Sequence, residues 1–275
     1  MMFADDTNTF LSNKNLNFLE ASANREIDKL TSWFRANKLS LNIPKTNFII
    51  FGNCKNKDTF QLKIDNISIN RVTNTTFLGV QIDEDLNWKH HISKICNKIA
   101  RNIGIIYRLS KFLPSNILRQ LYFTLVYPYL YYCNLVWANN TAASLENLIV
   151  LQKRVIRIIS NSHYLEHTSP LFKAKRILKL TDINNLQIGQ FMYQYTNSIL
   201  PRIFENFFTT NADMHMHLTR HRGNFRAEFF RTRKKLYTVR VKGPRVWNVL
   251  EPGLKNSGSL LTFKKNYIKK ILSTY

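Results

Sequence analysis

Apolar side chains recur at steps of three and four between residues 15 and 38, which places them on one face of a helix. The members of this face are Leu16, Leu19, Ala23, Ile27, Leu30 and Phe34. Ser12 and Asn13 precede this face, and either side chain is a suitable N-cap. The pattern therefore predicts a capped amphipathic helix in this part of the chain.

The next fifty residues change to the period of β-strands. Segment 39–52 alternates and breaks at Pro44, which predicts a strand, a turn and a second strand. Residues 62–69 predict a short hairpin with its turn at Asp65-Asn66, and residues 76–82 predict a further strand.

From Trp88 onward the apolar positions return to helical spacing. The predicted helices cover about residues 89–110, 114–137 with a break near Pro128, 143–160 and 182–198. After about residue 200 the chain is rich in Arg and Lys, and prolines at 201, 244 and 252 divide it into short pieces. The predicted fold class is α+β, mixed up to about residue 85 and mostly helical beyond it.

The first ten residues, MMFADDTNTF, run from an apolar stretch into two adjacent carboxylates, Asp5 and Asp6. An apolar run, a polar tip and an alternating return predict a β-hairpin. Two like charges at such a tip repel one another unless a cation lies between them, and Mg²⁺ is often held by one or two carboxylates. A solvated Asp-Asp turn is the alternative interpretation of this stretch alone.

Charge is the strongest compositional signal in the chain. The 275 residues hold 40 Lys and Arg against 17 Asp and Glu, a net charge of +23. Residues 1–100 hold 13 basic and 10 acidic side chains, a net of +3, whereas residues 101–275 hold 27 and 7, a net of +20. The second part therefore predicts a polyanionic partner, most simply nucleic acid, with an anionic membrane surface as the lesser option.

Three cysteines at 54, 96 and 133 show no paired spacing, which argues against a disulfide framework or a zinc finger and favours a reducing, intracellular setting. No basic region followed by an apolar core marks a signal peptide. The most apolar stretch, residues 121–137, contains Pro128 and Asn134, which favours a buried helix pair over a membrane span. The expected location is the nucleus or the cytoplasm.

Four segments then follow in an order that is typical of one family. FADD at 3–6 resembles the catalytic hairpin of reverse transcriptases, in the form usual among non-LTR (LINE-like) retrotransposons. WFRANKLSLNIPKTNFIIFG at 33–52 resembles the segment that follows this hairpin, and TTFLGVQIDEDLNWKHHI at 75–92 resembles the primer-grip hairpin and the entry to the thumb. LYFTLVYPYLYYCNLVW at 121–137 resembles the helical region after the thumb in jockey-like and CR1-like elements.

This resemblance implies an architecture. Residues 1–85 would form the C-terminal part of a reverse transcriptase palm, residues 86–165 a helical thumb-like region, and residues 166–275 a basic C-terminal extension. In the family the FADD hairpin lies deep within the palm, so the chain is expected to be the C-terminal portion of a longer, truncated polymerase. The fingers, the strand with the first catalytic carboxylate and the rest of the palm would then be missing partners, and the chain alone would be inactive or nearly so.

The resemblance also implies the chemistry, which is RNA-directed DNA polymerisation, a two-metal nucleotidyl transfer. Asp5 would be the direct ligand of Mg²⁺, with Mn²⁺ as an alternative, and Asp6 the supporting ligand, in the complete active site only. Lys45 would lie near the pyrophosphate leaving group and stabilise its charge, with Asn42 and Thr46 shaping its loop. A solvated turn lysine beside Pro44 is the alternative for Lys45.

Contacts to nucleic acid are expected in three further places, with an RNA template and a DNA primer or target as partners. Phe77, Leu78 and Gly79 match the primer-grip turn by resemblance, although FLG as sequence alone is more often an ordinary core strand. Lys94, Lys98 and Arg101 share one helix face, either as contacts to the template–primer backbone or as a solvated face. Lys153, Arg154 and Arg157 admit the same two interpretations. The acidic run at 83–85 is expected to be a solvated loop rather than a metal site.

The densest basic segment, residues 220–247, holds ten Lys and Arg against Glu228 alone among acids. Its nucleic-acid-binding candidates are Arg220, Arg222, Arg226, Arg231, Arg233, Lys234 and Lys235. Interleaved aromatic residues at 225, 229, 230, 237 and 247 either stack on unpaired bases or form a small core. His215 and His217 are expected to lie in a polar loop.

Three functional hypotheses remain open at this stage. The chain is part of a polymerase, a non-catalytic RNA- or DNA-binding module that keeps its basic surface but lacks a complete catalytic site, or a decayed element copy. Loss of polymerisation without loss of binding on Asp5→Asn would separate the first two.

Overall fold

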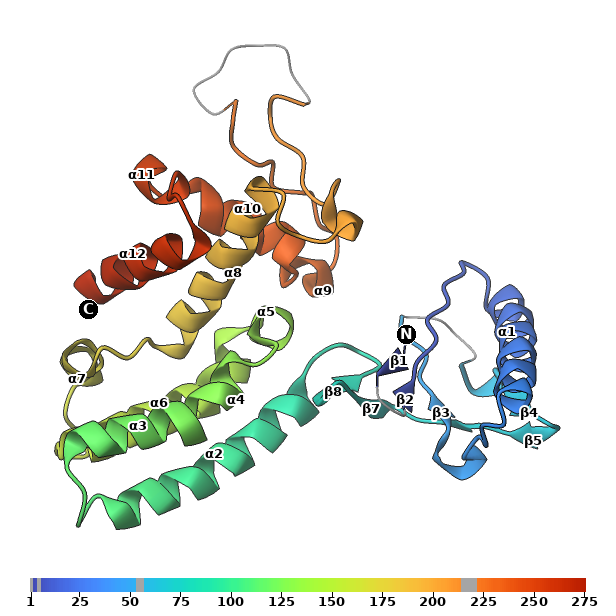
Figure 1. Cartoon of the computed structure of the whole chain (residues 1–275), viewed down its shortest axis with the longest axis horizontal. Helices are drawn as coiled ribbons and strands as arrows, with labels where there is room; N and C mark the ends of the chain where they lie inside the picture. The colour runs from blue at the N-terminus through green and yellow to red at the C-terminus, as the bar shows by residue number, and fades with distance from the viewer. Residues whose placement is uncertain (1, 4–5, 53–56, 214–221) are drawn as a thin grey trace. The chain divides into compact units, whose positions relative to one another are not determined.

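The computed structural model describes residues 2–3, 6–52, 57–213 and 222–275, without the side chains of residues 2, 3 and 233. The chain divides into two compact units, Met1–His90 and His91–Tyr275, called here the first and second units. Small two-stranded sheets and one long helix make up the first unit, and helices make up most of the second (Figure 1). The predicted mixture of helices and strands is confirmed at this level.

Three antiparallel hairpins occur in the described part of the first unit. Strand β1 (Met2–Phe3) pairs with β2 (Asp6–Thr7), β4 (Lys63–Ile64) with β5 (Ile67–Ser68), and β7 (Asn74–Phe77) with β8 (Val80–Asp83). The hairpin predicted over residues 62–69 is confirmed. Its turn residues Asp65 and Asn66 both have positive φ, 51° and 65°, which is the conformation that Asp and Asn tolerate best in a two-residue turn.

Helix α1 (Leu16–Ala36) confirms the predicted amphipathic helix but begins at a different cap. The Asn15 side chain, rather than that of Ser12 or Asn13, accepts hydrogen bonds from the backbone N–H groups of Asn17 and Phe18. Asn13 instead accepts from the backbone of Asn15, at 2.9 Å. The predicted caps were therefore two or three positions too early, since any Ser or Asn before the apolar face fits the sequence pattern.

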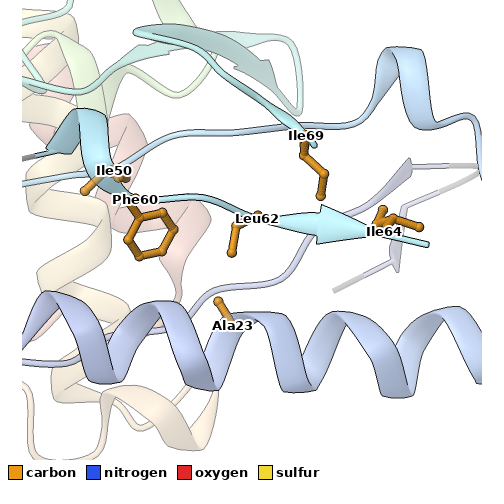
Figure 2. Close-up of a cluster of buried hydrophobic side chains, with 6 residues drawn as sticks. All are labelled: Ala23, Ile50, Phe60, Leu62, Ile64 and Ile69. Carbon is orange, nitrogen blue, oxygen red and sulfur yellow. The ribbon is translucent and has the colours of Figure 1, made fainter. Parts of the chain in front are cut away.

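The core of the first unit forms where α1 faces the strands and loops after it. Figure 2 shows Ala23 of α1 beneath a row of buried side chains from the following segments: Ile50, Phe60, Leu62, Ile64 and Ile69. The small Ala23 side chain lets the row approach the helix closely, and Asn24 beside it bonds the backbone of Gln61 and Lys63. Strand β4 is thus fixed to α1 by apolar burial and by two hydrogen bonds.

Two strand predictions were wrong. In segment 39–52 the expected first strand does not form at residues 39–42, and η1 (Ile43–Lys45) lies where the turn at Pro44 was expected. Strand β3 (Asn47–Phe48) lies within the expected second strand and pairs in parallel with β6 (Asn70–Arg71). The expected strand 76–82 is the β7–β8 hairpin, which turns at Leu78-Gly79. Pairing with a segment over twenty residues away, and a turn built from Leu-Gly, are not visible in local alternation. A second short 3₁₀ helix, η2, covers Lys57–Thr59.

A partly buried ion cluster ties together the loops of the first unit. The Glu84 carboxylate accepts from Arg71 at 2.8 Å and from Lys57 at 3.2 Å, and Arg71 also bonds Asp58. The two cations, chiefly through the Arg71 hydrogen bond, lower the pKa of Glu84. Residues from η2, β6 and the end of β8 are therefore linked through a single carboxylate.

The second unit is helical in its described residues. Its long helices are α2 (Lys89–Leu109), α3 (Ser115–Leu125), α6 (Ala142–Ser160), α8 (Leu180–Thr196) and α12 (Leu260–Ser273). Shorter elements are α4 (Tyr127–Tyr131), α5 (Asn134–Trp137), α7 (Thr168–Lys175), η3 (Arg202–Phe204), α9 (Arg233–Leu236), α10 (Val239–Asn248) and α11 (Pro252–Lys255). The break near Pro128 is confirmed, because α3 ends at Leu125 and Pro128 lies in the first turn of α4.

Helix α8 is the centre of this unit (Figure 1). It packs against α10, α12, α5, α4 and α6, and it buries residues on all sides, among them Ile183, Leu186, Ile188 and Met192. A helix that is buried all round lacks a polar stripe. No helix in the described ranges is long and apolar enough to cross a membrane.

Close packing around α8 depends on two glycines. A Cβ on Gly189 would lie 2.7 Å from Tyr267 Cε1 of α12, and one on Gly243 of α10 would lie 2.7 Å from Met192 Sδ. Pro244 follows Gly243 inside α10 and is buried there, so the expected break at this proline was wrong. The burial of α10 against α8 outweighs the loss of one backbone hydrogen bond.

A buried glutamine joins three segments of the second unit. Gln152 of α6 donates to the Tyr122 hydroxyl of α3 and to the Leu178 carbonyl, and it accepts from the Leu180 N–H, all at 2.9 Å. Gln152 is 2% exposed and Tyr122 is fully buried. This amide therefore satisfies the N-terminus of α8 inside the core.

Candidate functional site

The strand pairing around Asp6 agrees with the predicted hairpin. Met2 pairs with Thr7 and Phe3 with Asp6, and Asp6 is exposed. Asp5, the expected direct metal ligand, lies outside the described residues, as does Ala4. Among the described residues no group of three or more His, Cys, Asp or Glu side chains could hold a metal ion. Carboxylate oxygen is nevertheless the donor that Mg²⁺ prefers.

Lys45 lies in a turn that its neighbours hold in shape. It ends η1 and is exposed, and its backbone N–H donates to the Asn42 side chain at 3.3 Å. The Thr46 hydroxyl donates to the Asn42 carbonyl at 3.0 Å. The expectation that Asn42 and Thr46 shape this loop is confirmed, and the Lys45 ammonium remains available to a solvent-side anion.

The β7–β8 hairpin places Phe77, Leu78 and Gly79 at its turn. Leu78 and Gly79 both have positive φ, 46° and 79°, so Gly occupies the second turn position, where a side chain would be strained. The half-buried Phe77 ring meets that of Phe10 edge to face, with centroids 5.5 Å apart. The segment that follows the β1–β2 hairpin therefore contacts the β7–β8 hairpin next to its turn.

The acidic run at 83–85 is solvated only in part, because Asp85 is exposed whereas Asp83, the last residue of β8, is buried. Asp83 is 5% exposed, and its carboxylate accepts from the backbone N–H groups of Asp85, Asn87 and Trp88 at 2.9–3.1 Å. Leu86 and Trp88 have left-handed backbones within this turn. The expectation was wrong for Asp83, because a carboxylate that satisfies three N–H groups is stable when buried. Asp83 organises the entry to α2.

Helix α2 separates apolar and basic residues within the second unit. Its buried face carries Ile92, Ile95, Ile99, Ile103 and Ile106. Lys94 and Arg101 are exposed, and Lys98 is half-buried with its Nζ 5.4 Å from the centre of the Tyr129 ring. In the described structure none of these three cations forms an ion pair.

His91 begins the buried face of α2. Burial, together with the nearby positive charges of Lys94 and Lys98, lowers the pKa of His91 to about 4. Its ring meets that of Trp137 with centroids 5.6 Å apart. His91 is therefore a neutral core residue at pH 7 and adds no charge to the basic face.

The C-terminal basic segment is part core and part surface. Phe225 and Trp247 are buried, whereas Phe229 is 79% exposed. Phe230 and Tyr237 are half-buried, with cations over their rings. The core interpretation is therefore confirmed for Phe225 and Trp247, whereas stacking of the exposed Phe229 on unpaired bases stays a prediction.

The cations of this segment also differ from one another. Arg222, Arg226, Arg231 and Lys234 are exposed, whereas Lys235 bonds the Glu228 carboxylate at 2.7 Å. Arg220 and the side chain of Arg233 lie outside the described residues, together with His215 and His217. Of the seven predicted cations, four are therefore exposed residues in the described part of the chain.

One cluster was not predicted. Lys153 and Arg157 were seen only as part of a helix stripe, and Lys179 was not singled out, yet all three line one pocket between α6, α7 and α8. The spacing of Lys153 and Arg157, four residues apart, was the available signal. Lys179 joins Lys153 and Arg157 at the pocket only through tertiary packing, which the spacing of residues along the chain does not show.

Comparison of the chain with protein-family models, with curated proteins and with solved structures gives no match. The resemblance to non-LTR reverse transcriptases therefore rests on the four motifs of the sequence itself.

Proposed function

We propose that this chain carries palm and thumb elements of an RNA-directed DNA polymerase, the reverse transcriptase of a non-LTR retrotransposon. Residues 1–85 act as the C-terminal part of the palm, residues 86–165 as the thumb-like region and residues 166–275 as a basic extension. The observation that carries the proposal is the antiparallel pairing of Met2–Phe3 with Asp6–Thr7. This pairing places Asp6 at the start of the returning strand of a tight hairpin.

The chemistry of the hairpin is that of a carboxylate pair. Mg²⁺ or Mn²⁺ bound by Asp5 and Asp6 would supply the Lewis acidity that nucleotidyl transfer needs. Lys45, exposed at the end of η1, stabilises negative charge that develops on the leaving group. The rigid Asn42–Thr46 turn limits the positions that this lysine can reach.

Binding of the template–primer is assigned to helix α2. Lys94, Lys98 and Arg101 form its basic face, and their charges are not neutralised by a described acid. Such contacts neutralise phosphates and carry no sequence preference. The backbone at Leu78-Gly79, with no side chain at Gly79, allows a strand to approach the β7–β8 turn closely.

Primer extension on an RNA template tests the catalytic part of the proposal. Residues 1–275 are assayed in Mg²⁺ and in Mn²⁺ beside the Asp5→Asn/Asp6→Asn variant, alone and mixed with a separately produced upstream palm and fingers segment. Extension by the unchanged chain that is lost in the double variant supports the proposal. Extension that survives the double substitution refutes the role of the hairpin.

Binding is tested separately with two charge-matched double variants. Lys94→Gln/Lys98→Gln removes two charges four residues apart from α2, and Lys265→Gln/Lys269→Gln removes two at the same spacing from the exposed side of α12. Only the α2 variant should weaken binding to an RNA–DNA duplex and reduce the slope of log affinity against log salt by roughly 2. Equal losses in both variants would show that total charge, and not the α2 face, governs binding.

The non-catalytic alternative is supported by the charge distribution. The net charge of +20 lies in residues 101–275, so binding does not require the Asp6 hairpin. A mixture that binds duplex through α2 but never extends a primer would favour a nucleic-acid-binding module over a polymerase.

A further inference from the structure

The second unit contains a pocket of about 390 Å³ whose walls come from α6, α7 and α8. Three cations line it, namely Lys153 and Arg157 of α6 and Lys179, which immediately precedes α8. Lys153 is exposed, and the other two are half-buried. A volume in this range is typical of sites for small organic ligands.

The positive charges of this pocket are not balanced by ion pairs in the described structure. The Lys179 ammonium donates to the Ser169 hydroxyl at 3.0 Å and lies 4.2 Å from the centre of the Tyr275 ring. Arg157 donates through Nε to the Glu166 backbone carbonyl at 2.9 Å, which fixes the guanidinium of a residue that lines the pocket. Glu166 is the one acid among the lining residues, and it is exposed.

Backbone donors add to these charges. Helix α7 begins at the pocket, and its N-cap residue, His167, does not cap it with a side-chain hydrogen bond. The first N–H groups of a helix have no partner within it and favour an anion. At α7 these groups belong to Thr168 and Ser169, which both line the pocket.

The start of α8 is held in place by side chains from other elements. Tyr275 accepts from the Lys179 N–H at 2.9 Å, and Gln152 accepts from the Leu180 N–H at the same distance. The Tyr275 hydroxyl in turn donates to Asp182. Lys179 is therefore held in position at the pocket before any ligand arrives, which reduces the entropic cost of binding.

We propose that this pocket binds the phosphate group of a nucleotide, between Lys153, Arg157 and Lys179. The apolar part of the lining, which includes Ile149, Leu165 and Phe172, lies against the sugar or base. Two sources supply this chemistry, a free nucleoside monophosphate and the phosphorylated end of a nucleic-acid strand. The inference does not depend on polymerase activity, and failed primer extension would leave it intact.

Isothermal titration of residues 1–275 with AMP and with adenosine tests the phosphate requirement. AMP should bind and adenosine should give no measurable heat of binding. A second pair of probes, tetrathymidylate with and without a 5′-phosphate, identifies the source. Binding of AMP as tight as that of the phosphorylated strand indicates a free nucleotide, and binding of the phosphorylated strand alone indicates a strand end.

Three variants test the residues. Lys153→Gln should weaken the phosphorylated ligand about tenfold, since a hydrogen bond to a charged group contributes at least this much. Arg154→Gln is the matched control, because Arg154 is exposed on the same helix and does not line the pocket. Glu166→Gln should strengthen binding, a result that a misfolded variant could not give.

Equal weakening by Lys153→Gln and Arg154→Gln would overturn the proposal. So would equal affinity for AMP and adenosine, or no phosphate-dependent binding of either probe pair.

Discussion

Replacement of Gln152 by Met should destabilise the second unit by about 3–7 kcal/mol. The side chains are similar in size, so the change removes polar groups without opening a large cavity. The Leu180 N–H and the Leu178 carbonyl both lose a partner at 2.9 Å, at residues that are 1% and 6% exposed. A buried backbone group left without a partner costs roughly 1–3 kcal/mol, and the lost bond to Tyr122 adds about 1 kcal/mol.

Tyr122→Phe is the control for this reasoning. It removes a single acceptor of Gln152 and leaves both backbone bonds, so its cost should be about 1 kcal/mol. In the double variant the two losses should not add, because the Gln152–Tyr122 bond is counted in each single variant.

Urea unfolding followed by circular dichroism measures the three stabilities, and hydrogen exchange of the Leu180 amide measures the local effect. Protection of this amide should fall in Gln152→Met and persist in Tyr122→Phe. A loss below about 1 kcal/mol in Gln152→Met, or unchanged protection at Leu180, would refute the assigned role of the amide.

Three further predictions concern other residues. Imidazole proton resonances of His91 should titrate near pH 4, and a midpoint at 6.5 would contradict the burial of this side chain. Because the pKa of His91 is lower in the folded state than the unfolded value of 6.5, the contribution of neutral His91 to stability is lost as the pH falls from 6.5 to 4. Glu84→Gln should lower the melting temperature at pH 7 but not in acid. The pKa of Glu84 is lowered in the folded state, so its carboxylate contributes to stability above the unfolded pKa and loses this contribution as the pH falls through the folded pKa. An equal effect at pH 3 would rule out the charge as the cause. Gly189→Ala should destabilise by about 1–2 kcal/mol through contact with Tyr267, whereas Gly104→Ala, with open space at its Cβ, should stabilise by about 0.5–1 kcal/mol; stabilisation by both in urea unfolding would exclude the contact.

Local patterns predicted the elements whose stability is local. The α1 face, the turn at Asp65-Asn66 and the break before Pro128 each follow from neighbouring residues, and each is present. The parallel pairing of β3 with β6 could not be predicted, because it depends on which distant segment covers α1. The buried position of Asp83 likewise follows from three N–H groups that a turn brings together after folding.

The candidate sites show the same division. Alternation predicted the strands around Asp6, and helical spacing predicted the common face of Lys94 and Arg101. The pocket could not be predicted from the sequence, because Lys179 joins Arg157 in its lining only after α7 turns the chain back. The composition gives the net charge of the second unit but does not show which of its cations lie close together.

The charge imbalance of the second unit has a consequence for its response to salt. Residues 91–275 hold 29 cations and 7 anions, so mutual repulsion opposes the compact state, although Glu228 and Glu251 neutralise a few charges locally. Added salt screens this repulsion and stabilises the unit, while the same salt weakens any contact with phosphates. The folded state and the bound state therefore respond to ionic strength with opposite signs. If the protein binds nucleic acid as proposed, high salt should release this ligand without unfolding the protein, whereas low salt should both destabilise the free protein and favour binding to a polyanion.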